Sequence, residues 1–304
     1  MIRTLGRLAL PLLVAGPLAA QGSTAPLVLR LAGGTRGLGF GDAYVAGRGP
    51  EAIFYNPAQI STATGMMLSL ERFGSASTLG TYAATTSLGG AFSAGFGAQY
   101  LDYGAATGVF PTVPGALGHR GPLDAASLAA TATLALRWKG FRWGAGAKYL
   151  AERVPADRGD GAALDLGAAR DMGRFTLGLA AQNLGGHLTV AGSRADFPTR
   201  VSAGAALNRY SVSTYFDIAA SAAVSRERDG RIVPAGGAEL SYVPLEGWLF
   251  QLRAGARREE GGPTPQRQPY TLGATAALDR LALDYAFEAI KGGHVGHRIG
   301  IRIQ

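Results

Sequence analysis

Cysteine is absent from the chain of 304 residues, and charged residues make up only 16% of it. The fold therefore contains no disulfide bond, and its stability must come from noncovalent packing and backbone pairing. No run of about 18 apolar residues follows position 22, which excludes a membrane-spanning helix there. After residue 65, no segment shows the spacing of apolar residues that is typical of an amphipathic helix. The charged fraction is low against the usual value of about 25%, which favours a protein with a large apolar outer surface.

The N-terminus has the pattern of an export signal. Arg3 and Arg7 precede an apolar run over residues 8–20, and small residues follow. This pattern is typical of a Sec signal peptide, so we expect residues 1–22 to be removed by cleavage near Ala20–Gly22. The alternative is that the apolar run forms an N-terminal helix of the folded protein.

Short alternating segments fill the chain from residue 66 to the end. Leu281, Leu283 and Tyr285 alternate with Ala282 and Asp284, which predicts a strand between an apolar and a polar environment. About fourteen such strands are expected, over residues 66–73, 79–87, 91–102, 126–138, 141–151, 162–170, 174–183, 198–208, 211–225, 231–243, 248–258, 269–280, 281–290 and 296–304.

The connections between these strands alternate between two kinds. Tight turns are expected at 89–90, 139–140, 172–173, 209–210, 245–247 and 279–280. Longer loops are expected at 74–78, 103–125, 152–161, 184–197, 226–230, 259–268 and 291–295. A soluble sandwich has no reason to sort its loops in this way, whereas a membrane barrel has short turns at one end and longer loops at the other.

Aromatic residues at the strand ends favour the same architecture. Trp138, Trp143 and Trp248 flank tight turns. At the opposite ends lie Phe73, Tyr100, Tyr149 and Tyr270. Two such belts mark the two interfaces of a membrane barrel. We therefore predict an all-β fold, a transmembrane antiparallel β-barrel of about 14 strands over residues 65–304.

The inward faces of the predicted strands are mainly polar, which argues against a channel lined by apolar side chains. A lumen charge network is expected from Arg253, Arg257, Asp284, Glu288, Arg298 and Arg302. Ion pairs between neighbouring strands explain these residues better than a catalytic carboxylate pair does. Glycine is frequent inside the strands, which leaves room for another segment to pack against the inner wall.

Residues 23–64 do not alternate and carry closely spaced glycines. The residues singled out as a hatch motif are Gly37, Gly39, Gly41, Asp42, Tyr55, Asn56 and Pro57. Spaced glycines favour sharp bends and close backbone approach. The spacing fits neither a Rossmann fingerprint nor a P-loop.

Two stretches resemble a known family. GLGFGDAYVA at 37–46, followed by FYNPA at 54–58, resembles the N-terminal signature of the PorV/PorQ group of outer-membrane proteins, within the FadL-like barrel superfamily. QNLG at 182–185 and FPTR at 197–200 resemble the same group. The resemblance implies a fourteen-stranded barrel with residues 23–64 folded into the lumen as a plug. The chain departs from it in its short loops and in its last residue, Gln304, where many barrels end in an aromatic residue.

The sequence shows no catalytic site, cofactor motif or metal-ligand cluster. The four histidines, at 119, 187, 294 and 297, are expected to be exposed loop residues. The net charge is +8, but the basic residues are dispersed along alternating strands, which argues against nucleic acid as a partner.

Three functions remain at this stage. The resemblance implies an outer-membrane protein associated with type IX secretion, which binds secretion-system subunits or exported proteins. The alternative is a FadL-like, hatch-gated transporter of small hydrophobic molecules, and the third is an outer-membrane enzyme. All three would contact outer-membrane lipid. Buried apolar residues on the lumen side, above the hatch, would favour the transporter.

Overall fold

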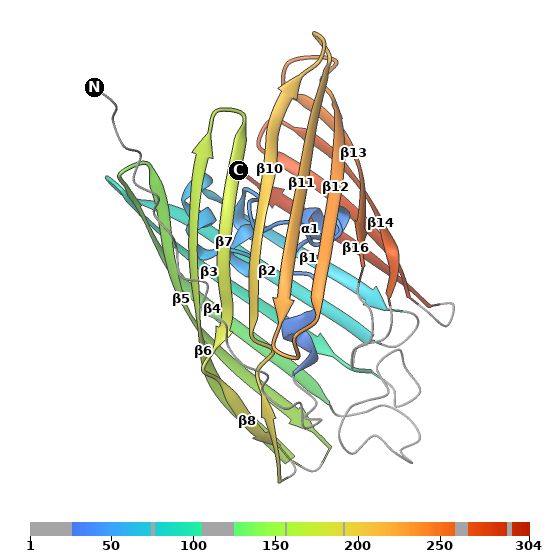
Figure 1. The fold of residues 1–304 in the computed structure, drawn as a ribbon. Coiled ribbons are helices and arrows are strands. Elements are labelled where there is room, and N and C mark those ends of the chain that lie inside the picture. The colour runs from blue at the N-terminus through green and yellow to red at the C-terminus, as the bar shows by residue number, and fades with distance from the viewer. Residues whose placement is uncertain are drawn as a thin grey trace, which may run out of the picture.

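The computed structural model describes residues 26–73, 77–104, 125–155, 157–190, 192–258, 267–290 and 294–304. Fourteen antiparallel strands form one closed barrel within this part of the chain (Figure 1). They are β1 (Gly65–Phe73), β2 (Ser77–Gly89), β3 (Phe92–Asp102), β4 (Ala126–Trp138), β5 (Phe141–Val154), β6 (Asp157–Met172), β7 (Phe175–Leu184), β10 (Arg200–Ser211), β11 (Phe216–Glu227), β12 (Ile232–Tyr242), β13 (Trp248–Arg257), β14 (Arg267–Leu278), β15 (Leu281–Ile290) and β16 (His294–Ile303).

The first and last strands close the barrel. β1 pairs with β16 in antiparallel register, from Met66 opposite Ile303 to Phe73 opposite Gly296. Closure leaves no strand edge exposed, so every ladder hydrogen bond is made within the sheet. The predicted fold class is confirmed. The expected signal peptide, residues 1–22, lies outside the described residues.

Burial alternates along the strands as expected. On β15, Leu281 and Leu283 are 55% and 54% exposed, whereas Ala282 and Asp284 are 4% and 3% exposed. The apolar face is therefore the outer face, and the polar face lines the lumen. Among the described residues, no helix is long and apolar enough to cross a membrane.

The aromatic belts are present, with one exception. Trp138, Trp143 and Trp248 are exposed beside tight turns, as expected. Phe73 was placed in the opposite belt by its position at a strand end, and this prediction is wrong. Phe73 is fully buried and faces the lumen, because it shares a face of β1 with Glu71.

The strand ends are sorted into a turn end and a loop end, but three predicted connections need correction. The turn expected at residues 209–210 lies inside β10, where the register with β11 shifts, and the real connection covers 212–215. The loop expected at 152–161 is a short turn, since β5 and β6 pair as far as Val154 and Asp157. The long loop at 184–197 contains a hairpin of its own, β8 (His187–Val190) and β9 (Ser193–Asp196).

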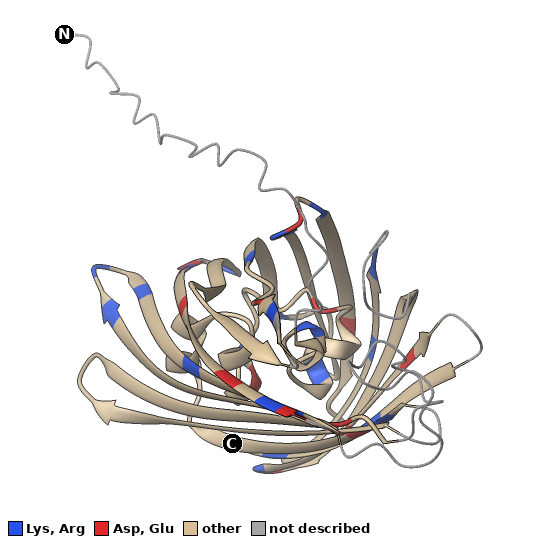
Figure 2. Ribbon diagram, turned by 90° about the horizontal axis from the view of Figure 1, so that it is seen from below, with Lys and Arg blue, Asp and Glu red and all other residues tan. Residues whose placement is uncertain are grey.

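The N-terminal segment lies inside the ring of strands (Figure 2). It forms four short helices, η1 (Leu27–Arg30), α1 (Thr35–Gly39), η2 (Pro50–Phe54) and η3 (Pro57–Thr62). Asn56 is the N-cap of η3, because its side chain accepts a hydrogen bond from the backbone N–H of Ala58 while Pro57 starts the helix. α1 contacts β13 to β16, and η3 contacts β2 to β6, so the segment reaches opposite sides of the wall.

Candidate functional site

Glycines on the inner wall of the barrel make room for the N-terminal segment, residues 26–64, which we call the hatch. A Cβ added at Gly144 would lie 2.3 Å from the carbonyl carbon of Pro57. A Cβ added at Gly167 would lie 2.0 Å from Oδ1 of Asn56. Both distances are far below van der Waals contact, so a side chain at either wall position would push η3 away.

The other side of the wall fits the hatch in the same way. A Cβ added at Gly178 would lie 2.4 Å from the carbonyl oxygen of Val45. One added at Gly255 would lie 2.2 Å from the backbone nitrogen of Gly41. These four interior glycines are therefore positions where the wall touches the hatch.

Asn56 ties the hatch to the wall with its amide group. Its Nδ2 donates to the carbonyl oxygen of Val45 at 2.9 Å and to that of Ala168, on β6, at 3.2 Å. Its Oδ1 accepts from Ala58 at 3.0 Å. The side chain is fully buried. Asn56 thus uses both ends of its amide where no water can replace the lost hydrogen bonds.

Asp42 and Tyr55 form a second tie between the hatch and the wall. The Tyr55 hydroxyl donates to Oδ1 of Asp42 at 2.9 Å and accepts from the backbone N–H of Gly33 at 3.0 Å. Arg257, on β13, forms an ion pair with the other carboxylate oxygen of Asp42. Asp42 has a φ of 65°, a left-handed conformation that Asp and Asn tolerate better than most residues.

The three motif glycines allow close approach around this tie. A Cβ on Gly37 would lie 2.3 Å from the Tyr55 hydroxyl oxygen. A Cβ on Gly39 would lie 3.5 Å from the Cα of Gly273 on β14, and one on Gly41, which has a φ of 66°, would lie 2.7 Å from the carbonyl oxygen of Ala256. The structure therefore brings all seven hatch-motif residues into contacts within the hatch or with the wall.

Part of the expected charge network lies beneath α1. Arg253 forms ion pairs with Glu239 and, at 3.8 Å, with Asp284. Arg302 pairs with Asp284 at 3.1 Å. Arg36 of the hatch pairs with Glu239 at 3.2 Å. The alternating pattern did not indicate Arg36 or Glu239. Arg36 lies outside the alternating segments, and Glu239 is the only acidic residue on a strand face made of small residues.

The remaining predicted charges lie in two other places. Arg298 pairs with Glu71 on β1 at 2.6 Å, and both are almost fully buried. Glu288 lies beside them, since a Cβ at Gly296 would be 2.9 Å from both Glu288 and Glu71. Arg257 instead binds the hatch. The six predicted residues therefore form separate groups on the inner wall.

Burial shifts the pKa values of two hatch groups. Burial raises the pKa of the Glu51 carboxyl above its ordinary value, and the nearby Arg36 opposes this effect only in part. Oε2 of Glu51 accepts from the backbone N–H of Arg36 at 3.2 Å. Burial also raises the pKa of the Tyr55 hydroxyl, with the charge of Asp42 as the next cause. Both groups thus favour their neutral forms while the hatch is seated.

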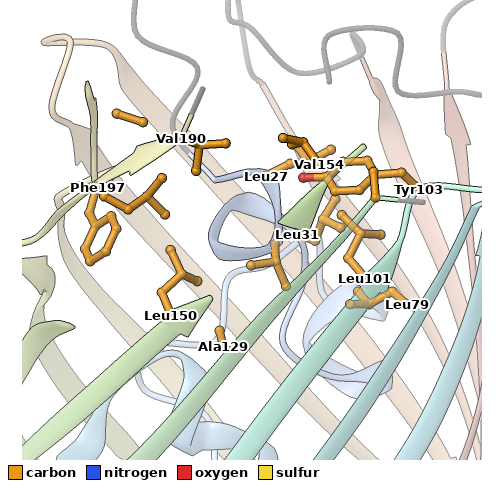
Figure 3. Packing of buried hydrophobic residues seen from close by; sticks show 14 of the residues in the cluster. Leu27, Leu31, Leu79, Leu101, Tyr103, Ala129, Leu150, Val154, Val190 and Phe197 are labelled. Carbon is orange, nitrogen blue, oxygen red and sulfur yellow. The ribbon is translucent and has the colours of Figure 1, made fainter. Parts of the chain in front are cut away.

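An apolar cluster fills the loop end of the lumen, and we call it the apolar chamber (Figure 3). η1 lies in the middle of it and inserts apolar side chains between the wall strands and the β8–β9 hairpin. Its buried members are Leu27, Val28, Leu31, Phe73, Leu79, Leu101, Tyr103, Ala125, Ala129, Leu150, Val154, Ala163, Leu188, Val190, Ala195, Phe197 and Ile290.

The chamber places apolar residues on an inner wall that we expected to be mainly polar. Leu79, Leu101 and Leu150 face inward and are fully buried near the loop ends of their strands. The inward polar residues Arg253 and Asp284 lie further towards the turn end. An apolar residue on the polar face breaks the alternation only at the strand ends, which is where sequence patterns are least reliable.

Three polar groups lie at the edge of the apolar chamber. The Tyr103 hydroxyl is 3.0 Å from Oγ of Ser127 and donates to Oε1 of Glu152 at 3.3 Å. Ser127 on β4 and Glu152 on β5 are direct register partners. The backbone of Leu27 also hydrogen-bonds the Tyr103 hydroxyl. Burial raises the pKa of this hydroxyl, which keeps it neutral.

The second stretch that resembles the family forms a local structural unit. Nδ2 of Asn183 donates to the carbonyl oxygen of Pro198 at 3.1 Å, and the Thr199 hydroxyl donates to the Asn183 carbonyl at 3.0 Å. Lys148 donates to Oδ1 of Asn183 at 2.6 Å. These bonds fasten the point where β7 ends and the β8–β9 hairpin turns towards the apolar chamber.

A cavity of about 500 Å³ lies at the turn end of the lumen. Hatch residues Arg36, Phe40 and Tyr44 line one side of it, and Ser221 and Gln251 of the wall line the other. The hatch therefore separates an apolar chamber at the loop end from a polar cavity at the turn end. Among the described residues, no group of His, Cys, Asp or Glu side chains is placed to hold a metal ion.

Several solved structures share this architecture. The Pseudomonas putida toluene transporter TodX has a TM-score of 0.58 at 10% identity, with 88% of this chain and 96% of that chain covered. The likeness establishes the fold. The monoaromatic hydrocarbon channel CymD has a TM-score of 0.57 at 14% identity, with 88% and 96% covered. A Pseudomonas aeruginosa FadL homologue has a TM-score of 0.53 at 12% identity, with 95% and 99% covered.

Sequence comparison adds no closer relative. No protein-family model matches the chain, and no curated protein matches it at a significant level. At these low identities the shared property is the barrel with its strand topology. The hatch contacts and the apolar chamber must therefore be interpreted from this chain's own residues.

Proposed function

We propose that the protein is an outer-membrane channel for small hydrophobic molecules, which the hatch closes at rest. The observation that carries the proposal is the apolar chamber at the loop end of the lumen. A barrel that only docks other proteins has no need for buried leucines on its inner wall. The hydrocarbon channels that share the fold support the same function.

The route that we propose runs from the loop end to the turn end. A small apolar molecule enters the chamber by taking the place of η1, whose apolar side chains fill it now. The hatch then has to move, because Asn56 and Asp42 hold it against the wall on either side. The polar cavity at the turn end receives the molecule after the hatch has moved.

Uptake of labelled toluene by intact Gram-negative cells tests this function. We expect cells that carry the protein to take up toluene several-fold faster than cells without it. Leu101→Asn should reduce this uptake, because it places an amide in the apolar chamber. Leu128→Asn is the matched control, since Leu128 lies at the same level of the barrel but is exposed on its outer face. Equal uptake with and without the protein would reject the proposal.

The secretion role suggested by the N-terminal motif is the second candidate. Its support is the resemblance at residues 37–58, whose conformation also fits a channel hatch. Crosslinking in native membranes, followed by a pull-down, separates the two functions. Recovery of secretion-system subunits or exported protein domains would favour secretion, and their absence together with facilitated toluene uptake would favour the channel.

A further inference from the structure

The polar group at the edge of the apolar chamber has spare hydrogen-bonding capacity. Oε1 of Glu152 accepts from Tyr103, and within the described part of the chain no other group bonds this carboxyl. Glu152 is only 7% exposed, Tyr103 is 4% exposed and Ser127 is fully buried. The other carboxyl oxygen, Oε2, can therefore accept a hydrogen bond from a molecule that enters the chamber.

The hatch now occupies the place that a ligand would take. The backbone of Leu27 bonds the Tyr103 hydroxyl, and the Leu27 side chain packs in the apolar chamber. η1 therefore presents one polar group at the edge of an apolar body. A molecule that replaces η1 has to satisfy the same surroundings, which are apolar on most sides and polar at Tyr103, Ser127 and Glu152.

Charge narrows the class of molecule further. Glu152 and Ser127 are bonded to the Tyr103 hydroxyl, and within the described residues no cation pairs with Glu152, so a ligand carboxylate placed there would be buried without a counter-charge. A neutral hydroxyl or amine, by contrast, can donate to the free oxygen of Glu152. A hydrocarbon without a donor would leave that oxygen unsatisfied.

We propose that Tyr103, Ser127 and Glu152 form a selectivity site, which favours small apolar or aromatic molecules carrying one hydroxyl or amino donor and rejects carboxylates. This inference rests on the proposed function, because it specifies the ligand of the same chamber. The donor of the ligand bonds Glu152, and its apolar body replaces Leu27 and Leu31.

Three compounds of nearly equal size test the inference. Toluene has no polar group, 4-methylphenol has a hydroxyl donor and 4-methylbenzoate has a carboxylate. We expect calorimetric titration of the purified full chain to show about tenfold tighter binding of 4-methylphenol than of toluene, which is the gain expected from one added hydrogen bond. We expect 4-methylbenzoate not to bind.

Two variants test whether the preference for 4-methylphenol over toluene arises from the selectivity site. Glu152→Gln keeps the size of the side chain but replaces one acceptor oxygen with an N–H donor, so it should lower the preference for 4-methylphenol several-fold and leave toluene binding unchanged. Tyr103→Phe, which removes the hydroxyl that orients Glu152, is a second variant in case the first does not fold. Glu246→Gln makes the same chemical change in an exposed turn at the other end and should have no effect.

The outcomes separate this inference from the proposed function. Equal binding of toluene and 4-methylphenol, or a preference that survives in both variants, would overturn the selectivity site while the channel function stands. If none of the three compounds binds and the protein does not facilitate toluene uptake, the proposed function itself fails.

Discussion

At the scale of single residues, the wall glycines and the hatch are complementary in shape. Gly144 and Gly167 have no Cβ where η3 lies, and Asn56 fills the space that they leave. The sequence showed frequent glycine inside strands and an isolated Asn-Pro pair. It gave no way to match the two, because that contact joins residues about a hundred positions apart.

A substitution at Gly144 tests this fit. We expect Gly144→Ala to lower the free energy of unfolding by about 1–3 kcal/mol, because the new methyl group overlaps with the backbone of η3. Urea unfolding in lipid vesicles measures the change. Gly236→Ala is the control, since a Cβ there meets only one atom, at 3.5 Å. Equal effects of the two substitutions would contradict the proposed fit.

Asp42 carries a second prediction at this scale. Asp42→Ala should weaken hatch seating by about 1–3 kcal/mol, because it removes one partner of Arg257 and the acceptor for Tyr55. Asp42→Asn retains an acceptor and a residue suited to the left-handed conformation, so it should have a smaller effect. Channel-opening frequency in planar bilayers measures both, and identical frequencies for the two variants would argue against the ion pair.

At the scale of elements, the hatch is a set of short helices held by polar ties. It has too few residues in any one helix to be stable alone, so its conformation depends on the wall. The alternation of the strands could be predicted from the sequence because each strand repeats it over about ten residues. The helices of the hatch and the four-residue strands β8 and β9 could not be predicted, since each is too short to show a recognisable repeat of apolar and polar residues.

Removal of part of the hatch tests its role as a plug. We expect a chain lacking residues 37–58 to conduct ions much better in planar bilayers, because these residues hold α1, η2 and the start of η3 inside the ring. Retention of the folded form on gels shows that the barrel still closes. Unchanged conductance in a folded barrel would mean that the hatch does not block the lumen.

Acidity should strengthen hatch seating through Glu51. Burial in the seated hatch raises the pKa of Glu51 above its ordinary value of 4.5. The charge of Asp284 adds to this effect, and Arg36, Arg302 and Arg253 oppose it. The stabilisation is therefore complete below about pH 4.5 and is lost as the pH rises through the raised pKa.

The corresponding measurement is opening frequency as a function of pH. We expect fewer openings at about pH 5 than at about pH 8, since the neutral carboxyl is the form that the buried site favours. Glu51→Gln should remove most of this dependence. A dependence that is the same in the variant would assign it to another group.

At the scale of the whole molecule, the main feature is the closed ring of strands. Loop parity and the aromatic ends predicted the closed fold, because both follow from crossing a bilayer. The apolar chamber could not be predicted, since its residues come from strand ends, the β8–β9 hairpin and η1. The extended β5–β6 hairpin was missed for a related reason, because strands that continue beyond the apolar outer band need not alternate.

A closed barrel should also be recognisable on a gel. We expect unboiled protein in mild detergent to migrate faster than boiled protein, because the barrel has no free edge from which unfolding can start. The protein should also fractionate with outer membranes. Identical migration of both samples, together with recovery in the soluble fraction, would refute the membrane barrel.

The ion pair between Asp42 and Arg257 also has a consequence for the order of assembly. The two residues are 215 positions apart, so the hatch leaves the export machinery long before its binding partners on β13 do. Its other contacts lie on strands that reach as far as β16, which must pair with β1 to complete the ring. We therefore expect the hatch, although it is made before the barrel strands, to reach its final position last, so that completion of the sheet sets the rate at which the lumen is sealed.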